Sequence, residues 1–308
     1  MITTHASRGL VWIDLSSPTD EEISGLVQRY DLHPLVGEEL RSVSSSMAKI
    51  DYYDDYMLVV LTLPLRINQG NGHAIVDREI DFVIGKNYLI TSRYDTIEQL
   101  EYFAKIFDAN AVLDKDRKME HAGHLFYYIV KRIYAGMLED LENIKDALLT
   151  AESRIYKGEE RNMVEALSSL SRELIDFRQT ARIHRELWQE LIGYENEALF
   201  GKEFTGYIHD LRDQFNHVNA LIDNARELLA DLRETNDSLL NTKQNDIMRT
   251  LTIVTFIFYP ATFIASLFTI PASFVPLIGS RNGWTIIFLG MIVITMGIWW
   301  YIKHKKWM

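Results

Sequence analysis

The chain has 308 residues, a formal net charge of −11 and no cysteine. The absence of thiols excludes disulfides, Cys-ligated zinc, iron–sulfur clusters and a cysteine nucleophile. The acidic balance argues against sequence-independent binding of nucleic acid, which requires a basic surface. We therefore expect no nucleic-acid partner.

The first part of the chain, residues 1–115, predicts a mixed α/β domain. Ser17–Glu22 begins a helix, because a proline and acidic side chains fit a first helical turn. Gly70–Gly72 lies between two strand-like segments and predicts a hairpin turn. The expected strands, which are rich in β-branched and aromatic residues, are Leu10–Leu15, Tyr56–Pro64, Glu79–Ile84 and Asn87–Ser92.

The next part, residues 116–247, predicts long helices. No proline occurs between positions 65 and 259, so the expected breaks are at glycines and give helices near 118–156, 161–192 and 204–270. In the third helix, apolar residues recur at alternating steps of three and four, which is typical of a coiled coil or a helix bundle. These residues are Ile208, Leu211, Phe215, Val218, Ile222, Ala225, Leu229 and Leu232. We expect this helix to form a stalk that continues into a membrane.

Two uncharged runs near the C-terminus predict transmembrane helices. Thr250–Ser280 has 31 residues without Asp, Glu, Lys or Arg, and Asn282–Ile302 has 21. Each run can span a hydrocarbon core of about 30 Å at ~1.5 Å per residue. We assign residues 248–270 and 284–302 to the two spans, 271–283 to an outer loop and 303–308 to a basic tail. The alternative is a buried helical hairpin in a soluble protein.

The charges around the spans predict their orientation. Two spans place both termini on one side, and Lys303, Lys305 and Lys306 mark that side as cytoplasmic. Lys243 and Arg249, before the first span, agree with this assignment. Residues 1–10 have no apolar core of a signal peptide. We therefore expect a multi-pass protein of the cell (inner) membrane, with a cytosolic body and both termini in the cytoplasm.

A stripe of polar residues runs along the first span. Its members recur at steps of three and four and therefore lie on one face of a helix. They are Thr252, Thr255, Tyr259, Thr262, Ser266, Thr269 and Ser273. The stripe can form the wall of a water-lined path, or its small hydroxyl residues can serve close packing and back-bond to their own helix. One helix cannot enclose a pore, so a path requires several copies of the chain.

Other candidate chemistry is weaker. Asp51, Asp54 and Asp55 form an acidic patch that could bind a hard cation, although solvated acids need no function. His121 and His124 could share a metal, but a solvated helix start is the preferred explanation. We find no catalytic motif and expect no enzyme activity.

Several segments resemble the CorA-type divalent-cation transporters, a family that includes the ZntB branch. The similarity covers most of the chain and is most specific in the first span. The segments that carry it are His33–Leu35, Tyr52–Tyr56, Gly85–Thr91, Met248–Val254, Pro260–Ala265 and Lys303–Trp307. The resemblance implies a homopentamer with an α+β cytosolic funnel domain, a long helical stalk that lines the pore, and a second span outside it.

The resemblance also implies roles for individual residues. The expected pore-lining residues are Met248, Leu251, Thr255, Tyr259, Thr262, Ser266 and Thr269, of which Met248 and Leu251 match an apolar constriction. The family's Gly-Met-Asn signature, or Gly-Ile-Asn in the ZntB branch, is replaced here by Thr269-Ile270-Pro271. Glu234 matches a stalk carboxylate that shares a regulatory cation with an acid of the neighbouring subunit, for which Asp54 or Asp55 is the expected partner.

Together these observations lead to one functional hypothesis and one alternative. The hypothesis is a homopentameric membrane channel or transporter for Mg²⁺, Zn²⁺ or a related divalent cation, without a covalently bound cofactor. Its partners are other copies of the chain, the lipid bilayer and divalent cations, which are transported and also regulatory. The alternative is a non-conducting scaffold or regulator of another membrane protein, because the signature tripeptide is absent.

Overall fold

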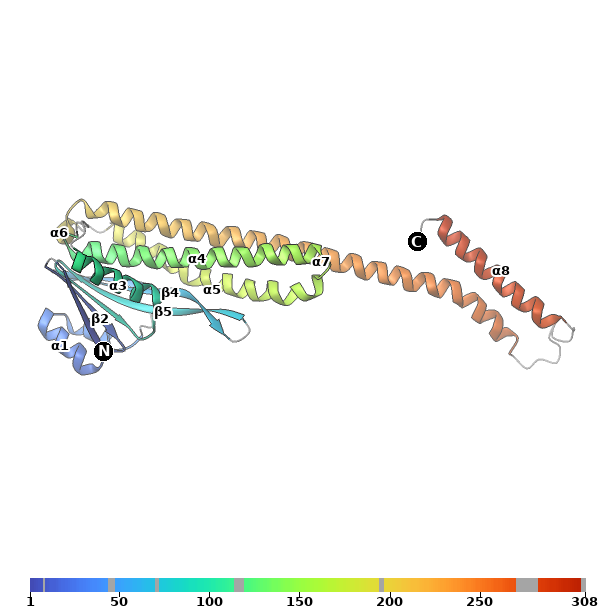
Figure 1. Cartoon of the computed structure of the whole chain (residues 1–308), viewed down its shortest axis with the longest axis horizontal. Coiled ribbons are helices and arrows are strands. Elements are labelled where there is room, and N and C mark those ends of the chain that lie inside the picture. The colour runs from blue at the N-terminus through green and yellow to red at the C-terminus, as the bar shows by residue number, and fades with distance from the viewer. Residues whose placement is uncertain are drawn as a thin grey trace. The chain divides into compact units, whose positions relative to one another are not determined.

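A computed structural model of the chain separates into two compact units, Met1–Arg233 and Glu234–Met308. The first unit combines a sheet with helices, and the second contains the end of a long helix and one further helix (Figure 1). The expected α+β class, with a long helix that ends in one apolar segment and a second apolar helix after it, is confirmed. The structure describes residues 1–7, 9–43, 48–69, 72–113, 119–193, 197–269 and 282–305.

The sheet of the first unit has the strand order β1-β2-β6-β5-β4-β3, and β2 and β6 are its parallel pair. Its strands are β1 (Ile2–Ser7), β2 (Leu10–Ser16), β3 (Ala48–Tyr52), β4 (Tyr56–Gln69), β5 (Gly72–Gly85) and β6 (Tyr88–Arg93). All four expected strands are present, and β4 and β5 extend well beyond the predicted segments. Gln69 pairs with Gly72, while residues 70 and 71 of the predicted hairpin turn lie outside the described residues.

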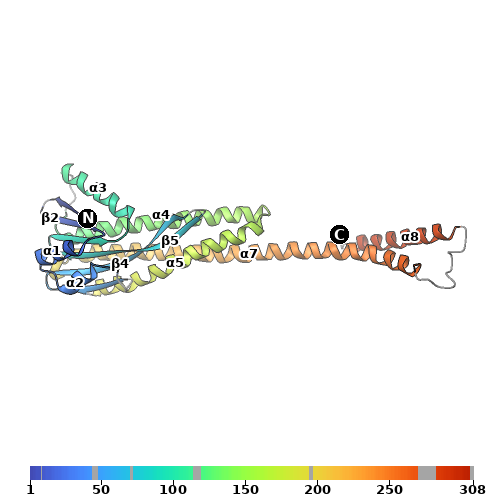
Figure 2. The same ribbon diagram turned by 90° about the horizontal axis from the view of Figure 1, so that it is seen from below.

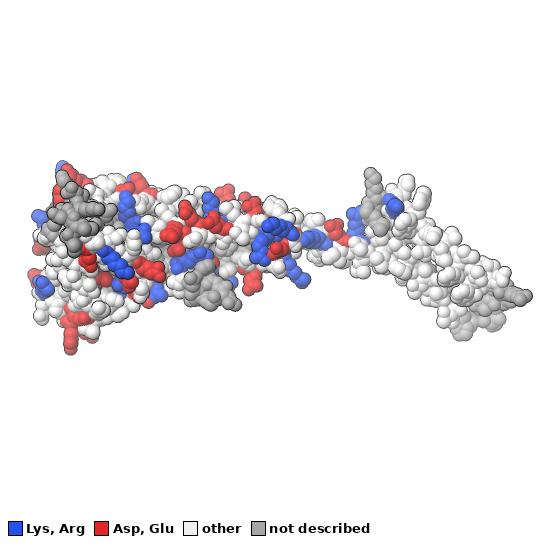
Figure 3. All heavy atoms as spheres, in the orientation of Figure 1, with Lys and Arg blue, Asp and Glu red and all other residues white. Residues whose placement is uncertain are grey.

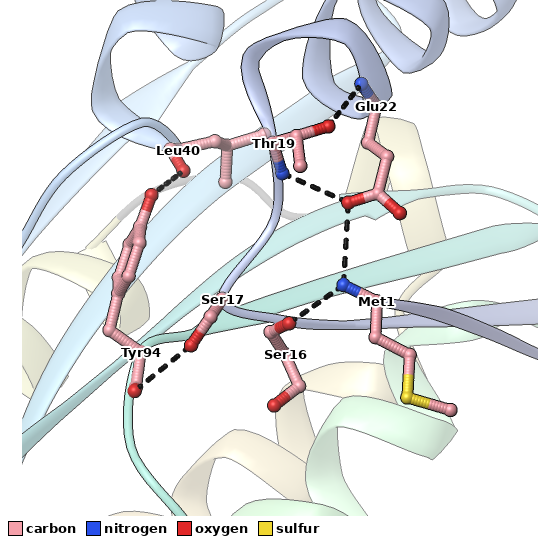
Figure 4. A network of polar contacts seen from close by, with 7 residues as sticks. All are labelled: Met1, Ser16, Ser17, Thr19, Glu22, Leu40 and Tyr94. Carbon is pink, nitrogen blue, oxygen red and sulfur yellow. Dashed lines mark hydrogen bonds and ion pairs between the residues drawn. The ribbon is translucent and has the colours of Figure 1, made fainter.

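One face of the sheet is covered by α1 (Asp20–Tyr30) and α2 (Pro34–Glu39). A capping box begins α1, where Thr19 Oγ1 accepts from the backbone of Glu22 at 3.3 Å and Glu22 Oε2 accepts from the backbone of Thr19 at 2.9 Å (Figure 4). Pro18 therefore precedes the cap, and the expectation that it stands in the first turn is wrong. The Tyr94 hydroxyl, at the end of β6, donates to the carbonyl of Leu40 at 2.9 Å and holds the end of α2 against the sheet.

The opposite face is covered by α3 (Glu98–Leu113), α4 (Ala122–Tyr156) and α5 (Glu160–Gly193), so that the sheet lies between two helical layers (Figures 1 and 2). The expected break between the second and third of these helices is confirmed at Lys157-Gly158, where Gly158 has φ 93°. On β5, the ring of Phe82 packs edge-on against that of Phe126 at 5.1 Å. This face of the sheet thus packs against α4 through apolar side chains.

A chain of buried hydrogen bonds joins α4, α5 and β4. The indole nitrogen of Trp188 donates to the Tyr134 hydroxyl at 2.7 Å, and this hydroxyl lies 3.0 Å from His184 Nδ1. His184 Nε2 lies 2.7 Å from the carbonyl oxygen of Thr62, to which it must donate. His184 is therefore neutral, with its proton on Nε2, and Nδ1 accepts from Tyr134. Burial lowers the pKa of His184 to about 4, although its bond to the Thr62 carbonyl opposes the shift.

The short helix α6 (Glu197–Phe200) leads into α7 (Phe204–Leu267), a helix of 64 residues. The eight apolar residues of the predicted heptad pattern are all at most 7% exposed. The ring of Phe215 lies 6.2 Å from that of Tyr134 on α4, and Arg233 donates to the carbonyl of Leu167 on α5 at 3.4 Å. The pattern therefore forms an intramolecular bundle, so these residues are not available to assemble copies of the chain.

Candidate functional site

The second unit is built from the C-terminal part of α7 and from α8 (Gly283–His304), which runs back antiparallel to it. Both α7 and α8 contain segments long and apolar enough to cross a membrane. Acidic and basic side chains are scattered over the visible surface of the first unit, whereas α8 and the last turns of α7 are almost free of them (Figure 3). The two membrane-spanning segments expected from the sequence thus both form helices.

The polar stripe lies on the membrane-spanning part of α7, and every described member is exposed in the single chain. Each threonine or serine hydroxyl of the stripe within the described residues donates to the carbonyl four residues earlier. The donor oxygens are those of Thr252 at 2.7 Å, Thr255 at 2.9 Å, Thr262 at 3.0 Å, Ser266 at 2.9 Å and Thr269 at 2.9 Å. The back-bonding considered from the sequence is therefore present along the whole described stripe.

Back-bonding determines what the stripe offers to its surroundings. A hydroxyl has one donor and two acceptor lone pairs. Because the donor is used inside the helix, the outward side of each back-bonded threonine or serine hydroxyl presents lone pairs only. These hydroxyls are consequently a ladder of hydrogen-bond acceptors, one or two helical turns apart, on a segment that carries no charge, whereas the exposed Tyr259 hydroxyl can still donate.

The apolar residues expected at a constriction are also uncovered. Met248 is 55% exposed, Leu251 is 57% exposed, and Tyr259 on the stripe is 69% exposed. Exposed large apolar surface marks contact with another protein surface or with a membrane. Of the signature-equivalent residues, Thr269 is the last described member of the stripe, whereas Ile270 and Pro271 lie outside the described residues.

The candidate regulatory acids are exposed. Asp54 and Asp55 lie in the turn between β3 and β4, and Glu234 lies on the surface of α7. In the described part of the chain, no three His, Asp or Glu side chains come together at metal-ligand spacing. The rings of His121 and His124 are tilted by 31° with centroids 4.0 Å apart, in an aromatic cluster with Phe204 and without a third ligand among the described residues.

A polar cluster near the start of α7 escaped the sequence analysis. Asp210 Oδ2 accepts from the Tyr127 hydroxyl at 2.6 Å, from Lys131 Nζ at 3.0 Å and from Gln214 Nε2 at 3.1 Å. The bond from Tyr127, together with Lys131, lowers the pKa of Asp210 below its usual range. The cluster fixes α7 to α4. The spacing of four residues within each pair, 127 with 131 and 210 with 214, was the available signal.

The chain has a mixed α+β unit rich in charged side chains, a long helix that starts in this unit, and two uncharged membrane-spanning segments. These features define a class of membrane protein with a large charged domain. Comparisons with known proteins identify the class further. The profile of the family described as CorA-like Mg²⁺ transporter protein matches residues 7–304. The cobalt/magnesium transport protein CorA of Thermotoga maritima is 25% identical over 321 aligned residues, which cover 99% of this chain and 88% of that protein.

Solved structures agree in fold. The CorA magnesium transporter from Methanocaldococcus jannaschii has a TM-score of 0.83 at 22% identity, covering 99% of this chain and 94% of that chain. The ZntB cytoplasmic domain from Vibrio parahaemolyticus has a TM-score of 0.59 at 14% identity, covering 76% of this chain and 89% of that chain. The chain belongs to the CorA-like Mg²⁺ transporter protein family. It is therefore a member of a family of membrane transporters, not of enzymes.

Proposed function

We propose that this chain transports divalent cations across the cell (inner) membrane as a homopentamer whose pore is lined by the stripe face of α7. Mg²⁺, Zn²⁺ and related ions are the proposed substrates, since the relatives include proteins named for cobalt and magnesium transport and a ZntB domain. The positive charges that flank the spans support cytoplasmic placement of both termini. The observation that carries the proposal is the ladder of back-bonded hydroxyls.

The ladder offers hydrogen-bond acceptors, which are the groups that the water shell of a hydrated cation needs. Water molecules around a cation turn their oxygens inward and their hydrogens outward, so the hydrated ion needs acceptors on the pore wall. An anion orders its water in the opposite sense and needs donors. Back-bonded hydroxyls supply acceptors without placing a fixed charge in the membrane, where an uncompensated charge is costly. Cations can therefore move along α7 with their first hydration shell retained.

Several copies are needed because one α7 supplies only one wall. The uncovered apolar residues Met248 and Leu251 support assembly at the foot of the span, where rings of such side chains can narrow or close the path. Glu234 and either Asp54 or Asp55 are proposed as regulatory ligands between subunits, in which a bound cation offsets the repulsion of neighbouring carboxylates. Proline at position 271 cannot supply the amide of the family signature, and this leaves zinc and magnesium as equal candidates.

Cation flux into proteoliposomes tests the proposal. We expect uptake of at least one of Mg²⁺, Zn²⁺, Ni²⁺ and Co²⁺, and a loss of at least tenfold in Thr262→Leu, since the bulky side chain removes an acceptor and narrows the path. Thr295→Leu is the matched control, because Thr295 also back-bonds, to Met291 at 2.8 Å, but lies on α8. Absence of flux for all four metals would contradict transport and favour the non-conducting scaffold.

A further inference from the structure

The last turns of α8 carry an unusual succession of aromatic and basic residues. Trp299, Trp300 and Tyr301 are followed, four positions later in each case, by Lys303, His304 and Lys305. Side chains four residues apart lie on the same face of a helix, so the six residues form three aromatic–basic pairs. We refer to these six residues as the collar.

The basic side chains of the collar fold back over the rings. Lys303 Nζ lies 5.0 Å from the centroid of Trp299, and Lys305 Nζ lies 5.6 Å from that of Tyr301. These distances are within the range of cation–π contacts. The rings of Trp300 and His304 are 5.5 Å apart. Each ammonium group therefore lies at the level of an aromatic ring and does not extend away from the helix end.

The collar surrounds most of the helix. Ile302 is only 5% exposed and marks the side of α8 that is covered. Successive residues of a helix are rotated by about 100°, which puts the Trp299–Lys303 and Tyr301–Lys305 pairs on the two flanks of Ile302 and the Trp300–His304 pair opposite it. Trp299, Trp300 and Tyr301 are 44%, 64% and 56% exposed. The collar thus exposes a surface of aromatic rings between two separated positive charges.

No acidic side chain lies near the positively charged collar in the sequence. The last 59 residues of the chain contain no Asp or Glu. Tryptophan and tyrosine rings favour the headgroup level of a bilayer, where they contact both acyl chains and polar groups. An ammonium group at the same level meets lipid phosphate groups. We propose that the collar is a binding site for anionic phospholipids, whose headgroups contact Lys303 and Lys305 and whose upper acyl chains contact the three rings.

The affinity of the full-length protein for phosphatidylglycerol relative to phosphatidylcholine tests this proposal. The proposal requires only that the protein is inserted in a membrane, and does not require that it transports ions. Vesicles of phosphatidylcholine receive brominated phosphatidylglycerol or brominated phosphatidylcholine, and quenching of tryptophan fluorescence reports binding. All proteins carry Trp284→Phe, which removes the tryptophan at the other end of α8, and Trp307→Phe, so that Trp299 and Trp300 are the reporters at the collar. Trp12 and Trp188 are fully buried in the first unit and remain unquenched in both lipids.

We expect the unmodified collar to prefer phosphatidylglycerol, with each lysine contributing about a fivefold preference, since a basic residue near an anionic membrane is worth about 1 kcal/mol. Lys303→Gln combined with Lys305→Gln should reduce the preference by roughly tenfold or more. Lys105→Gln combined with Lys145→Gln, two exposed lysines of the first unit, should leave it unchanged. Replacement of both collar lysines by arginine should retain it.

Three results would overturn the proposal. The first is an undiminished preference in the double glutamine variant, and the second is an equal loss in the first-unit control. The third is competition by excess inorganic phosphate, which would identify a site for small anions in place of lipid. If the glutamine variant does not fold, the salt dependence of the parent protein decides, because a preference that does not fall with ionic strength contradicts contact between exposed charges.

Discussion

Replacing Tyr134 by phenylalanine tests the buried hydrogen-bond chain that holds α4, α5 and β4 together. The change removes only the hydroxyl, which accepts from Trp188 at 2.7 Å and bonds His184 at 3.0 Å. All three side chains are fully buried, so water cannot replace the lost partner. One donor and one acceptor are left unpaired, at a cost of about 1–3 kcal/mol each. We therefore expect the unfolding free energy of the first unit to fall by about 2–6 kcal/mol.

Thermal unfolding of the full-length protein in detergent measures this loss. For a unit of this size, 1 kcal/mol corresponds to a shift in Tm of about 2–4 °C, so the expected loss should lower the Tm of Tyr134→Phe by roughly 4–24 °C. Tyr156→Phe is the matched control on the same helix, where the side chain is 68% exposed and the expected shift is close to zero. Equal shifts in the two variants would refute the assignment of these hydrogen bonds.

Three further predictions concern the first unit. The pKa of His184 is 6.5 in the unfolded chain and about 4 in the folded protein. Between these two pH values only the unfolded chain binds a proton at this residue, so the free energy of unfolding should fall by up to about 3 kcal/mol on acidification. His184→Gln should flatten the dependence of Tm on pH in that window, and an unchanged slope contradicts the assignment. Burial raises the pKa of Asp140 to about 6, against a bond from the Arg66 backbone, so Asp140 opposes folding when charged. Asp140→Asn should stabilise by roughly 1 kcal/mol at about pH 8, after allowance for partial exposure, and by only a small fraction of this at about pH 4; an equal gain at both pH values counts against this. A Cβ at Gly123 would lie 2.9 Å from the ring of Phe204, so Gly123→Ala should destabilise the protein by about 1–3 kcal/mol. Gly25→Ala is the control, because a Cβ at Gly25 on α1 would meet open space and should not destabilise the protein. Similar Tm values for the two variants would exclude the close approach of Gly123 to Phe204.

Local patterns in the sequence predicted much of the fold because they report local physics. The heptad pattern of Ile208–Leu232 required a covered face, and all eight residues are buried. Its partner could not be predicted, because helix periodicity identifies the apolar face and not the surface that covers it. The strands β1 and β3 lie at the edges of the sheet and are largely not fully buried, so they lack the strong apolar runs that revealed β4 and β5.

The candidate site divides in the same way. The period of the polar stripe predicted that its members share one face of the helix, and the described members are all exposed in the single chain. A sequence does not reveal where a hydroxyl hydrogen points, so both back-bonding and contact with water were open. The structure resolves the first point, since Thr255 and Thr262 donate within their own helix. The bond between His184 and Thr62 joins residues 122 positions apart, and no local pattern signals such a contact.

The most direct test of the central claim is single-cysteine accessibility along α7, which is clean because the chain contains no cysteine. Phe256 and Phe263 are each 57% exposed and lie beside the stripe residues Thr255 and Thr262, so that all four positions are open in the single chain. In the membrane, a cationic methanethiosulfonate reagent should modify cysteine at 255 and 262 and block Mg²⁺ or Zn²⁺ flux. Cysteine at 256 and 263 should remain unmodified. Equal modification of both pairs, or modification at 256 and 263 alone, would contradict a pore lined by the stripe.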